Sequence, residues 1–548
     1  MNQPDDRVPV PSLLWPPGHG RDSGSAGLTA QQALDLGLDV LVRELDWDGR
    51  HGQHVRSLLL ALVADPAVIA YRQAIVVELA GRQRLCAALA ALLPHLAELA
   101  QPRSAGWGHE SPLLTVPPRL SDLEHYVACI DELHAALSDE DGLHAAGWRG
   151  LLDYVRATRT SEEFQALAAE LPELRAQLDQ AASVTIGVNL DRDLRPVAAT
   201  LVSINREPFV GPRSLVQRLL GRSTPATLPG ATILRQIAER PPEVDPLSRD
   251  LQQILSEVVQ PVAAALERYG RVQVRPLAAL EQELAFFLSA VRFAARRAAQ
   301  GLPVCLPVID AREHRLAEAY NPSLAIQLAA PSGNGHQAGA LPLVLNPIDF
   351  EPGRIVFLTG PNRGGKTTYL RAVGLNQVLF QAGAYVAAAQ ARMVPADAIL
   401  THFPPVEGVE LGAGRLDDEA RRLREMFAQA TPNSLLLFNE PLTSTGEREA
   451  QVLAGDVLRA LRLLRARTVY VTHLHALAYE LELLNGADGG ATIMSWIAGV
   501  AEDAARTYVI RPGTPAARSH AATIAEQHGI TFAQLARQLA DRGVTRQE

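Results

Sequence analysis

Two kinds of hydrophobic pattern alternate along the chain, and they predict where helices give way to strands. Over 28–183 apolar residues recur three and four positions apart, and 82–99 is so rich in Ala and Leu that we expect a buried helix there. Over 184–190 and 199–204 polar and apolar residues alternate and β-branched residues are frequent, which predicts a β-hairpin. Helical spacing returns over 247–301. This part of the chain is therefore expected to be mainly helical, with one small β-containing insertion.

The last part of the chain has a different order of elements. From Ile355 an apolar strand, a glycine-rich turn and a helix follow one another, and strand candidates at 434–439 and 468–472 are each followed by a helical segment. This alternation predicts an α/β domain with parallel strands and crossover helices. We therefore expect a multidomain chain, divided into a mobile segment (1–27), a helical core (28–183), a small insertion (184–246), a returning helix (247–301) and the α/β domain with a helical tail (302–548).

Composition adds that the cores are built mainly from aliphatic side chains. Hydrophobic residues make up 47% of the 548 residues but aromatic residues only 5%, which favours Ala- and Leu-rich helices. The formal net charge is −9, so overall charge does not indicate nucleic-acid binding, although a local basic groove would be enough for it. Cys86, Cys129 and Cys305 have no metal-ligand spacing. With no signal-peptide pattern and no apolar run of the ~18–20 residues that span a membrane, we expect a cytoplasmic protein without a membrane partner.

The turn after the first strand of the α/β domain has the residues of a phosphate-binding loop. Gly360 is followed, after four residues, by Gly-Lys-Thr at 365–367, which is the P-loop pattern. Its glycines let backbone N–H groups and the helix N-terminus face an anion. We predict an ATP site formed by Gly360, Pro361, Asn362, Gly364, Gly365, Lys366, Thr367 and Thr368, with the Thr367 hydroxyl on Mg²⁺. The alternative is a glycine-rich turn with an incidental lysine.

Two later strands end in the polar residues that such a site needs. The strand at 434–439 ends in Asn439 and is followed by Glu440, and the strand at 468–472 is followed by His473. We predict that Asn439 is a second Mg²⁺ ligand, that Glu440 is the general base for the attacking water, and that His473 contacts the γ-phosphate. A buried strand with a solvated end and a structural histidine are the alternatives.

These motifs, in this order and spacing, resemble the ATPase domain of the MutS family, an ABC-type P-loop domain. The segment 359–371 (Thr-Gly-Pro-Asn-Arg-Gly-Gly-Lys-Thr-Thr-Tyr-Leu-Arg) is close to the family's Thr-Gly-Pro-Asn-Met-Gly-Gly-Lys-Ser-Thr. The other matching segments are 381–387, 396–403, 434–440, 443–445, 471–473 and 508–530. More faintly, 65–73 is similar to the start of the family's helical core, and two helical stretches around an insertion look like its lever and clamp. The resemblance implies a homodimer that holds ATP and Mg²⁺ between two ATPase domains.

Three features depart from the family pattern. Asn439 stands where the family has Asp, and the 441–442 connection is two residues shorter than usual. Gly414, followed by Arg415, stands where the family's signature loop has Ser; in the dimer this loop closes the partner's nucleotide site. These departures indicate slow hydrolysis rather than a loss of ATP binding.

The leading hypothesis is a dimeric, ATP-switched clamp on mismatched, branched or recombination DNA. No Phe-x-Glu motif, with which the family's mismatch readers stack on a mispaired base, is found in 1–60, so we expect backbone- or shape-directed, salt-dependent binding. The candidate DNA contacts, whose alternative is a solvated basic face, are Arg192, Arg195, Arg206, Arg213, Arg218 and Arg222. The alternative functions are a nucleotide-binding protein acting on a ribosome, an RNA or a protein partner, and a weakly active structural ATPase.

Overall fold

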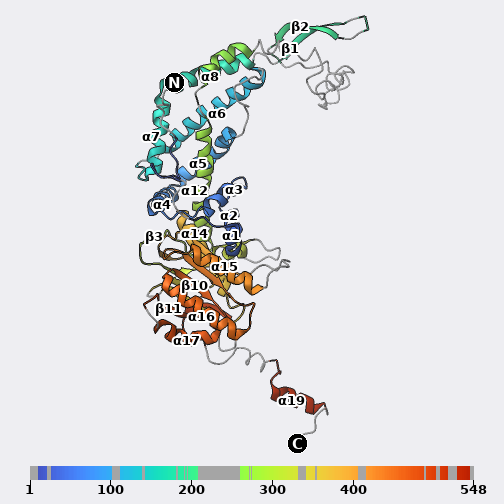
Figure 1. The fold of residues 1–548 in the computed structure, drawn as a ribbon. Coiled ribbons are helices and arrows are strands. Elements are labelled where there is room, and N and C mark those ends of the chain that lie inside the picture. Colours follow the sequence, from blue (N-terminus) through green and yellow to red (C-terminus); the bar gives the residue numbers. More distant parts are fainter. Residues whose placement is uncertain are drawn as a thin grey trace. The chain divides into compact units, whose positions relative to one another are not determined.

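The computed structural model describes the chain in segments, which Figure 1 draws as coloured ribbon. The described residues are 10–20, 26–100, 112–138, 142–179, 183–190, 192–193, 196–205, 207, 259–270, 272, 274–330, 341–351, 354–404, 415–486, 489–500, 506–515 and 528–542. Contacts divide the chain into two compact units, each assembled from stretches that are distant in sequence. The first unit holds Met1–Pro11, Ala87–Leu143 and Trp148–Glu281, and the second holds Ser12–Cys86, His144–Gly147 and Gln282–Glu548.

The described part of the first unit consists of helices and one β-hairpin. Its helices are α5 (Gln83–Ala100), α6 (Pro112–Ser138), α7 (Ala146–Thr160), α8 (Glu162–Asp179) and the start of α12 (Arg275–Ala299). The returning segment is helical from 259 and is interrupted by a turn at 268–270 before α12 begins. Buried Arg119 of α6 donates hydrogen bonds to the carbonyl oxygens of Tyr269 and Val272, at 3.0 and 2.8 Å, and so holds this turn against α6.

The predicted β-hairpin is present in the first unit. Its strands β1 (Ser183–Leu190) and β2 (Pro196–Asn205) pair antiparallel, with two register shifts. Neither strand contains a charged residue. Because two strands alone bury little surface, Val188, Leu190 and Val202 remain 40, 53 and 66% exposed.

The second unit contains the predicted sheet of parallel strands. Its order is β12-β11-β6-β10-β9-β8, in which β12 alone runs antiparallel to its neighbour. The strands are β6 (Ile355–Thr359), β8 (Ile399–His402), β9 (Leu435–Asn439), β10 (Arg467–Val471), β11 (Ile493–Val500) and β12 (Arg506–Pro512). Every residue of β6, β9 and β10 is buried, as expected for central strands that are covered on both faces.

Helices cover both faces of this sheet. On one face α15 (Arg415–Gln429), α16 (Glu447–Leu464) and α17 (His475–Gly486) share a core with Phe357, Phe438 and Tyr470. On the other face lies α14 (Lys366–Gln381), next to α1 (Ala30–Leu36). At Gly374 of α14 a Cβ atom would lie 3.0 Å from Leu437 and 2.4 Å from Leu36, so the missing side chain allows this close packing.

A smaller sheet and a short helix stand beside the larger one in the same unit. The small sheet has the order β3-β7-β4-β5, formed by β3 (Val308–Ile309), β4 (Arg315–Ala319), β5 (Asn346–Asp349) and β7 (Gln390–Met393). Helix α13 (Pro322–Ala329) follows β4 and is capped by Asn321, whose side chain accepts a hydrogen bond from the Leu324 amide.

Helices from the start of the chain also belong to the second unit. They are α1, α2 (Leu38–Glu44), α3 (Gly52–Leu60) and α4 (Pro66–Ala80), which the sequence pattern had grouped with a helical core over 28–183. Polar contacts tie them to the larger sheet and to α14. Thr401 donates to the Asp35 carboxylate at 2.6 Å, Arg371 to the Asp35 carbonyl at 2.8 Å, and Gln381 to the Val63 carbonyl at 2.9 Å.

Part of the segment expected to be mobile, 1–27, is firmly held. Leu13 and Leu14 are 0 and 2% exposed, and the Glu283 carboxylate of α12 accepts hydrogen bonds from Ser12 Oγ at 2.7 Å and the Leu13 amide at 2.5 Å. The expectation of mobility does not hold for these residues, because a buried carboxylate supplies the acceptors that their backbone and hydroxyl groups need.

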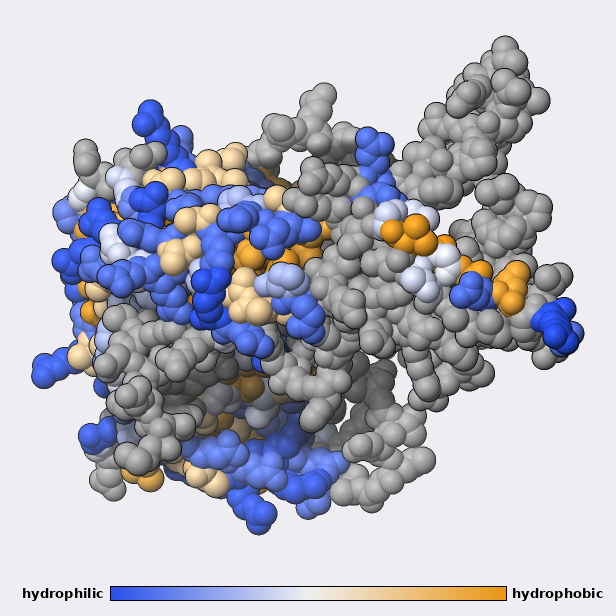
Figure 2. Space-filling model, turned by 90° about the horizontal axis from the view of Figure 1, so that it is seen from above, coloured by the Kyte–Doolittle hydropathy of each residue, from blue (hydrophilic) through white to orange (hydrophobic). Residues whose placement is uncertain are grey.

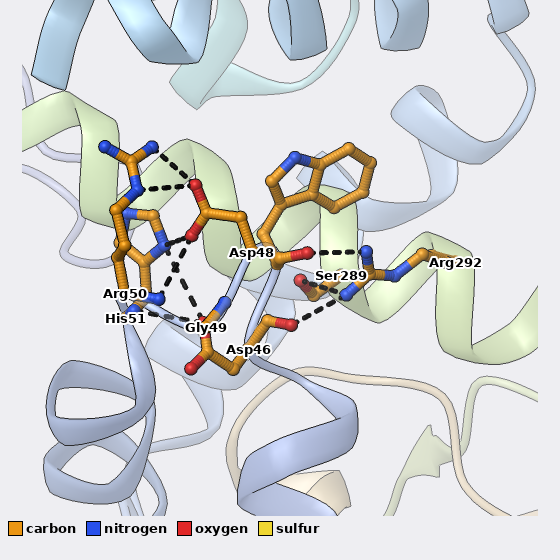
Figure 3. Close-up of polar contacts among 8 residues, drawn as sticks. Asp46, Asp48, Gly49, Arg50, His51, Ser289 and Arg292 are labelled. Atoms are coloured by element: carbon orange, nitrogen blue, oxygen red, sulfur yellow. Dashed lines mark hydrogen bonds and ion pairs between the residues drawn. The ribbon is translucent and has the colours of Figure 1, made fainter. Parts of the chain in front are cut away.

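A polar turn between α2 and α3 anchors α12 (Figure 3). The amides of Gly49 and His51 both donate to Asp46 Oδ1 at 3.0 Å, and Arg50 donates to the Asp48 carboxylate at 2.7 Å. Arg292 of α12 donates to the Asp46 carbonyl at 2.8 Å. Asp46, Asp48 and His51 have metal-ligand atoms within 4.8 Å of one another, but the carboxylates already serve as acceptors within the turn. We therefore interpret this cluster as the structure of the turn.

The described surface is mixed in polarity. On the face seen in Figure 2, apolar side chains lie in small patches between hydrophilic ones. Helix α19 (Phe532–Asp541) has no buried residue, and Phe532 is 88% exposed. Within the described residues, no helix combines the length and the hydrophobicity needed to cross a lipid bilayer.

Candidate nucleotide-binding site

The glycine-rich turn connects the central strand β6 to α14, in the predicted strand–loop–helix context. Gly365 caps α14 with a φ of +90°, and no side chain accepts from the amides of the first turn. Gly360 has a φ of +141°, and a Cβ atom there would lie 2.7 Å from Ala498. Glycine is therefore required at both ends of the loop, and the amides of the first helical turn remain available to bind an anion.

Lys366 is the only lysine among the 548 residues, so the other 50 of the 51 basic residues are arginines. Its side chain is 4% exposed, and its ammonium group donates to the carbonyl oxygens of Gly360 and Pro361 at 2.8 and 3.1 Å. It lies 3.5 Å from a Glu440 carboxylate oxygen. Burial lowers the pKa of Lys366, and the nearby Glu440 opposes this effect. The chain has arginine at every other position occupied by Lys or Arg. Only in this loop does it have a lysine, whose compact ammonium charge is typical of P-loops.

The two predicted metal ligands are in direct contact. Thr367 Oγ1 donates a hydrogen bond to Asn439 Oδ1 at 3.1 Å, which brings the start of α14 to the end of β9. A hydroxyl and an amide oxygen are hard donors, and together with phosphate oxygens they fit Mg²⁺. Asn439 contributes no negative charge, so this pair offers an ion only neutral oxygen atoms.

Glu440 follows β9 in an unusual backbone conformation. Its φ is +51° and that of Leu442 is +63°, although neither is glycine. Pro441 stands between them, in the connection that is two residues shorter than the family pattern. His473, after β10, has its Nδ1 3.9 Å from the second oxygen of Glu440. Left-handed non-glycine residues concentrate at functional sites, and this pair turns Glu440 towards Lys366 and His473.

One cavity of about 440 Å³ joins these residues to an apolar pocket. Of the predicted site residues, Gly364, Gly365, Lys366, Thr367, Thr368 and Glu440 line it. Its apolar wall consists of Leu324, Leu328, Pro342, Leu343, Val344 and Ile348. A loop for phosphates next to an apolar wall fits a ligand with a polyanionic tail and a flat, weakly polar head.

Tyr508 and Asn346 also line the cavity, and the sequence reasoning did not identify either. Tyr508 of β12 has a φ of +58°, and its ring lies 3.4 Å from where a Cβ atom of Gly365 would be. Asn346 of β5 fixes it by donating to the Tyr508 carbonyl at 3.1 Å and accepting from the Ile510 amide at 2.6 Å. Because 162 positions separate Asn346 from Tyr508, no local pattern indicates this pairing.

A second buried contact links the loop after Glu440 to α15. Ser444 Oγ donates to Glu419 at 2.6 Å, and Glu419 is 5% exposed. Beneath α15, Phe357, Tyr470, Phe438 and His402 stand opposite one another on the neighbouring strands β6, β10, β9 and β8. The ring centroids are 5.8, 5.4 and 6.3 Å apart along this row. Phe438 of this row directly precedes Asn439, the residue at the end of β9. Helix α15 therefore packs on the same strands that position the site.

Some predicted residues are not placed at the cavity. Asn362 is an exposed residue of the loop, and Arg192 is exposed in the turn of the β-hairpin. Arg415 is the first residue of α15, and its side chain is not among those described. Gly414, Arg195, Arg206, Arg213, Arg218 and Arg222 lie outside the described residues.

Comparison with known proteins assigns both halves of the chain to one family. A sequence model of the MutS2 N-terminal domain matches residues 64–299, and a model of MutS domain V matches residues 356–537. The DNA mismatch repair protein MutS of Synechococcus sp. (strain CC9902) is 33% identical over 206 residues, which are 37% of this chain and 22% of that protein. MutS of Prochlorococcus marinus (strain MIT 9303) is 38% identical over 147 residues, 26% of this chain and 16% of that protein.

The chain thus aligns with less than a quarter of the length of each of these two relatives. The two family models nevertheless match in the expected order, and the second covers the P-loop, both strand tips and most of α19. The chain belongs to the MutS family.

Proposed function

We propose that the second unit binds ATP with Mg²⁺ and hydrolyses it. The observation that carries the proposal is the single cavity in which the P-loop, the only lysine and Glu440 meet next to an apolar wall. The apolar wall and Tyr508 would hold the base, and the loop amides with Lys366 would hold the phosphates. The ABC-type arrangement of the domain in a dimer is part of this proposal.

The residues present suggest a division of roles during hydrolysis. Mg²⁺, when bound with the nucleotide, would neutralise charge on the phosphate oxygens. Thr367 and Asn439 would hold that ion, and Glu440 would orient the attacking water and accept its proton. Lys366 would exchange its loop carbonyls for phosphate oxygens, and His473 would contact the γ-phosphate. Because Asn439 is neutral, we expect turnover to be slow.

The single lysine permits a direct test of the binding site. An amine-acylating reagent can modify only Lys366 among the side chains, so peptide mass spectrometry can follow its protection. We expect ATP with Mg²⁺ to protect Lys366, and adenosine to protect it much less. ATP hydrolysis should be lost in Glu440→Gln while protection by ATP remains. If ATP neither protects Lys366 nor binds the native protein in the presence of Mg²⁺, the proposed site is refuted.

We further propose that ATP drives a homodimeric clamp on DNA. Support comes from membership of the MutS family and from relatives that are named DNA mismatch repair proteins. The decisive measurement titrates mismatched, branched and plain duplex DNA, with and without ATP, at two salt concentrations. Contacts to phosphates predict that binding weakens steeply with salt. Stronger binding to mismatched than to plain duplex would contradict the expectation that mismatch reading is absent.

A second candidate partner is a protein or a ribosome rather than DNA. The observation that favours it is the β-hairpin, whose strands carry no charged residue and expose Val188, Leu190 and Val202. Two uncharged strands with exposed apolar side chains suit a protein surface better than a phosphate backbone. Salt-insensitive binding to a protein partner, without measurable binding to any of the three DNAs, would decide for this candidate.

A further inference from the structure

Arg363, in the middle of the P-loop, combines an unusual backbone conformation with a charged side chain at the cavity. It is exposed, and it lines the same cavity as Lys366, Glu440 and Tyr508. Its φ is +61°, a left-handed conformation that costs a non-glycine residue about 1 kcal/mol or more. Glycine occupies the next two positions and would remove this cost here. A strained arginine at the rim of a binding cavity therefore suggests that its side chain has a function.

The guanidinium group of Arg363 is not engaged by the rest of the described chain. Some exposed arginines of the second unit pair with carboxylates, as Arg315 does with Asp349 at 2.8 Å and Arg392 with Asp310 at 3.3 Å. Arg363 has neither an ion pair nor a side-chain hydrogen bond with a described residue. Because the guanidinium has five N–H donors and a permanent charge, it is available to an anionic ligand in the cavity.

Arg363 and Asn439 shift the charge of the site in the same direction. The resembling family motif has Met at the position of Arg363 and Asp at the position of Asn439. Relative to that pattern this site gains one positive charge and loses one negative charge, a difference of two. The charged residues that line the cavity are then two cations, Arg363 and Lys366, and one anion, Glu440. The protein would therefore attract a metal ion less strongly. Because two cations already face the phosphates, less of the phosphate charge would remain for a metal ion to neutralise.

We propose that Arg363 is a second phosphate-binding cation, and that together with neutral Asn439 it makes nucleotide binding at this site largely independent of Mg²⁺. The inference rests on the proposed ATP site and specifies how its charge is balanced. Hydrolysis would still require the metal ion, because an ion held by Thr367 and Asn439 would neutralise the charge that develops on the phosphate oxygens while Glu440 orients the attacking water. Binding and turnover therefore differ in their metal requirement.

The test measures binding of a fluorescent, non-hydrolysable ATP analogue in excess EDTA and in saturating magnesium chloride. For the wild type we expect similar dissociation constants in the two buffers. Arg363→Met should weaken metal-free binding about tenfold, the loss expected for one charge-assisted contact, and Mg²⁺ should restore part of it. Asn439→Asp should weaken metal-free binding and strengthen binding in Mg²⁺, which would widen the difference between the two buffers.

Two further variants separate charge from loop structure. Arg363→Gly removes the side chain and relieves the left-handed strain, so it should lose affinity as Arg363→Met does although its loop is less strained. Arg312→Met, at another exposed arginine of the second unit that does not line the cavity, should bind as the wild type does.

Wild-type affinity of Arg363→Met and Arg363→Gly in EDTA would overturn the role of Arg363 while leaving the ATP site intact. A wild type that binds the analogue in Mg²⁺ but not in EDTA would overturn the metal independence. A wild type that binds in neither buffer would refute the proposed function itself, and the role of Arg363 with it.

Discussion

Among single residues, His402 is held in one protonation state by its surroundings. It ends β8, is 2% exposed and stacks on Phe438. Burial, and then the charge of Arg422, lower the pKa of His402 to about 4. The folded protein therefore keeps the imidazole neutral, whereas the unfolded chain protonates it near its ordinary pKa of about 6.5.

This difference predicts a pH dependence of stability. Because the pKa of His402 is lower in the folded than in the unfolded protein, the unfolded chain binds a proton first as the pH falls. The free energy of unfolding is therefore unaffected by His402 above about pH 6.5 and decreases as the pH falls towards 4. We expect His402→Phe, which keeps a stacked ring but cannot titrate, to lose less stability than the wild type over this window. The difference should approach about 3 kcal/mol at the low end. Urea unfolding followed from pH 7 to pH 4 measures it, and parallel pH profiles would contradict the assignment.

Gly383 shows how one missing side chain fixes the position of α14. It ends the helix with a φ of +78°, and its amide donates to the Phe380 carbonyl at 2.9 Å. A Cβ atom there would lie 2.3 Å from the Cβ of Arg72, which is fully buried in α4. The helix that begins at the P-loop is thus seated directly against α4.

Gly383→Ala is therefore expected to destabilise the second unit by about 2–4 kcal/mol, from backbone strain and overlap together. Gly455→Ala is the matched control, because Gly455 is a helical glycine of α16 with nothing near its missing side chain. The control should be neutral or stabilise by about 1 kcal/mol. Thermal unfolding of both variants checks this, and equal melting temperatures would contradict the close approach to Arg72.

At the scale of elements, the contact between Ser444 and Glu419 joins the loop that carries Glu440 to helix α15. Removing this hydrogen bond should allow the loop after Glu440 to move without changing the phosphate-binding residues. We expect Ser444→Ala and Glu419→Gln each to lower kcat for ATP about tenfold with little change in nucleotide affinity. Ser444→Thr, which keeps the hydroxyl, should recover most of the rate.

A double-mutant cycle distinguishes this coupling from two separate structural effects. The variant with both changes should be no slower than either single variant, because the second change removes a partner that is already lost. Additive losses, or a loss of ATP affinity equal to the loss of kcat, would show that the pair does not position the catalytic loop.

The same elements show which features a sequence can reveal. The P-loop and the ends of β9 and β10 were predictable, because each is a local pattern of an apolar strand followed by a few polar residues. The β-hairpin was predictable from its alternation. Tyr508 and Asn346 were not, since their place in the cavity depends on the pairing of β12 and β5 with distant parts of the chain. Arg363 stood within the predicted loop, but only its φ and its lack of a described partner distinguish it.

At the scale of the whole molecule, the second unit is assembled from both ends of the chain. Leu36 of α1 packs against Gly374, Gln381 is bonded to the Val63 carbonyl, and Leu13 is fully buried. Linear hydrophobic patterns could not reveal this, because α1 to α4 have the same helical spacing as the helices of the first unit. A boundary at 302 would cut through the core of the second unit.

This assembly predicts the behaviour of fragments. A fragment of residues 302–548 lacks Leu36, which packs against Gly374, and the Val63 carbonyl that accepts from Gln381, and it exposes the apolar face of α14 that α1 covers. We expect it to be insoluble or to unfold without cooperativity, because a buried helix face left open cannot be offset by the remaining contacts. Co-expression of 10–86 with 282–548 should instead give a soluble complex, since the two fragments together contain nearly all of the second unit, including α1 to α4 and α14, although the cuts shorten α5 and α12.

The complementing fragment also supplies the control. Changing Leu36 to Asp within 10–86 places a charge against α14, and it should abolish rescue while leaving that fragment expressed. Size-exclusion chromatography and ATP protection of Lys366 in the reconstituted complex provide two independent measurements. If 302–548 alone folds cooperatively and its Lys366 is protected by ATP, the N-terminal helices are dispensable for the nucleotide site. In that case their contacts with α14 only attach them to a domain that is stable without them.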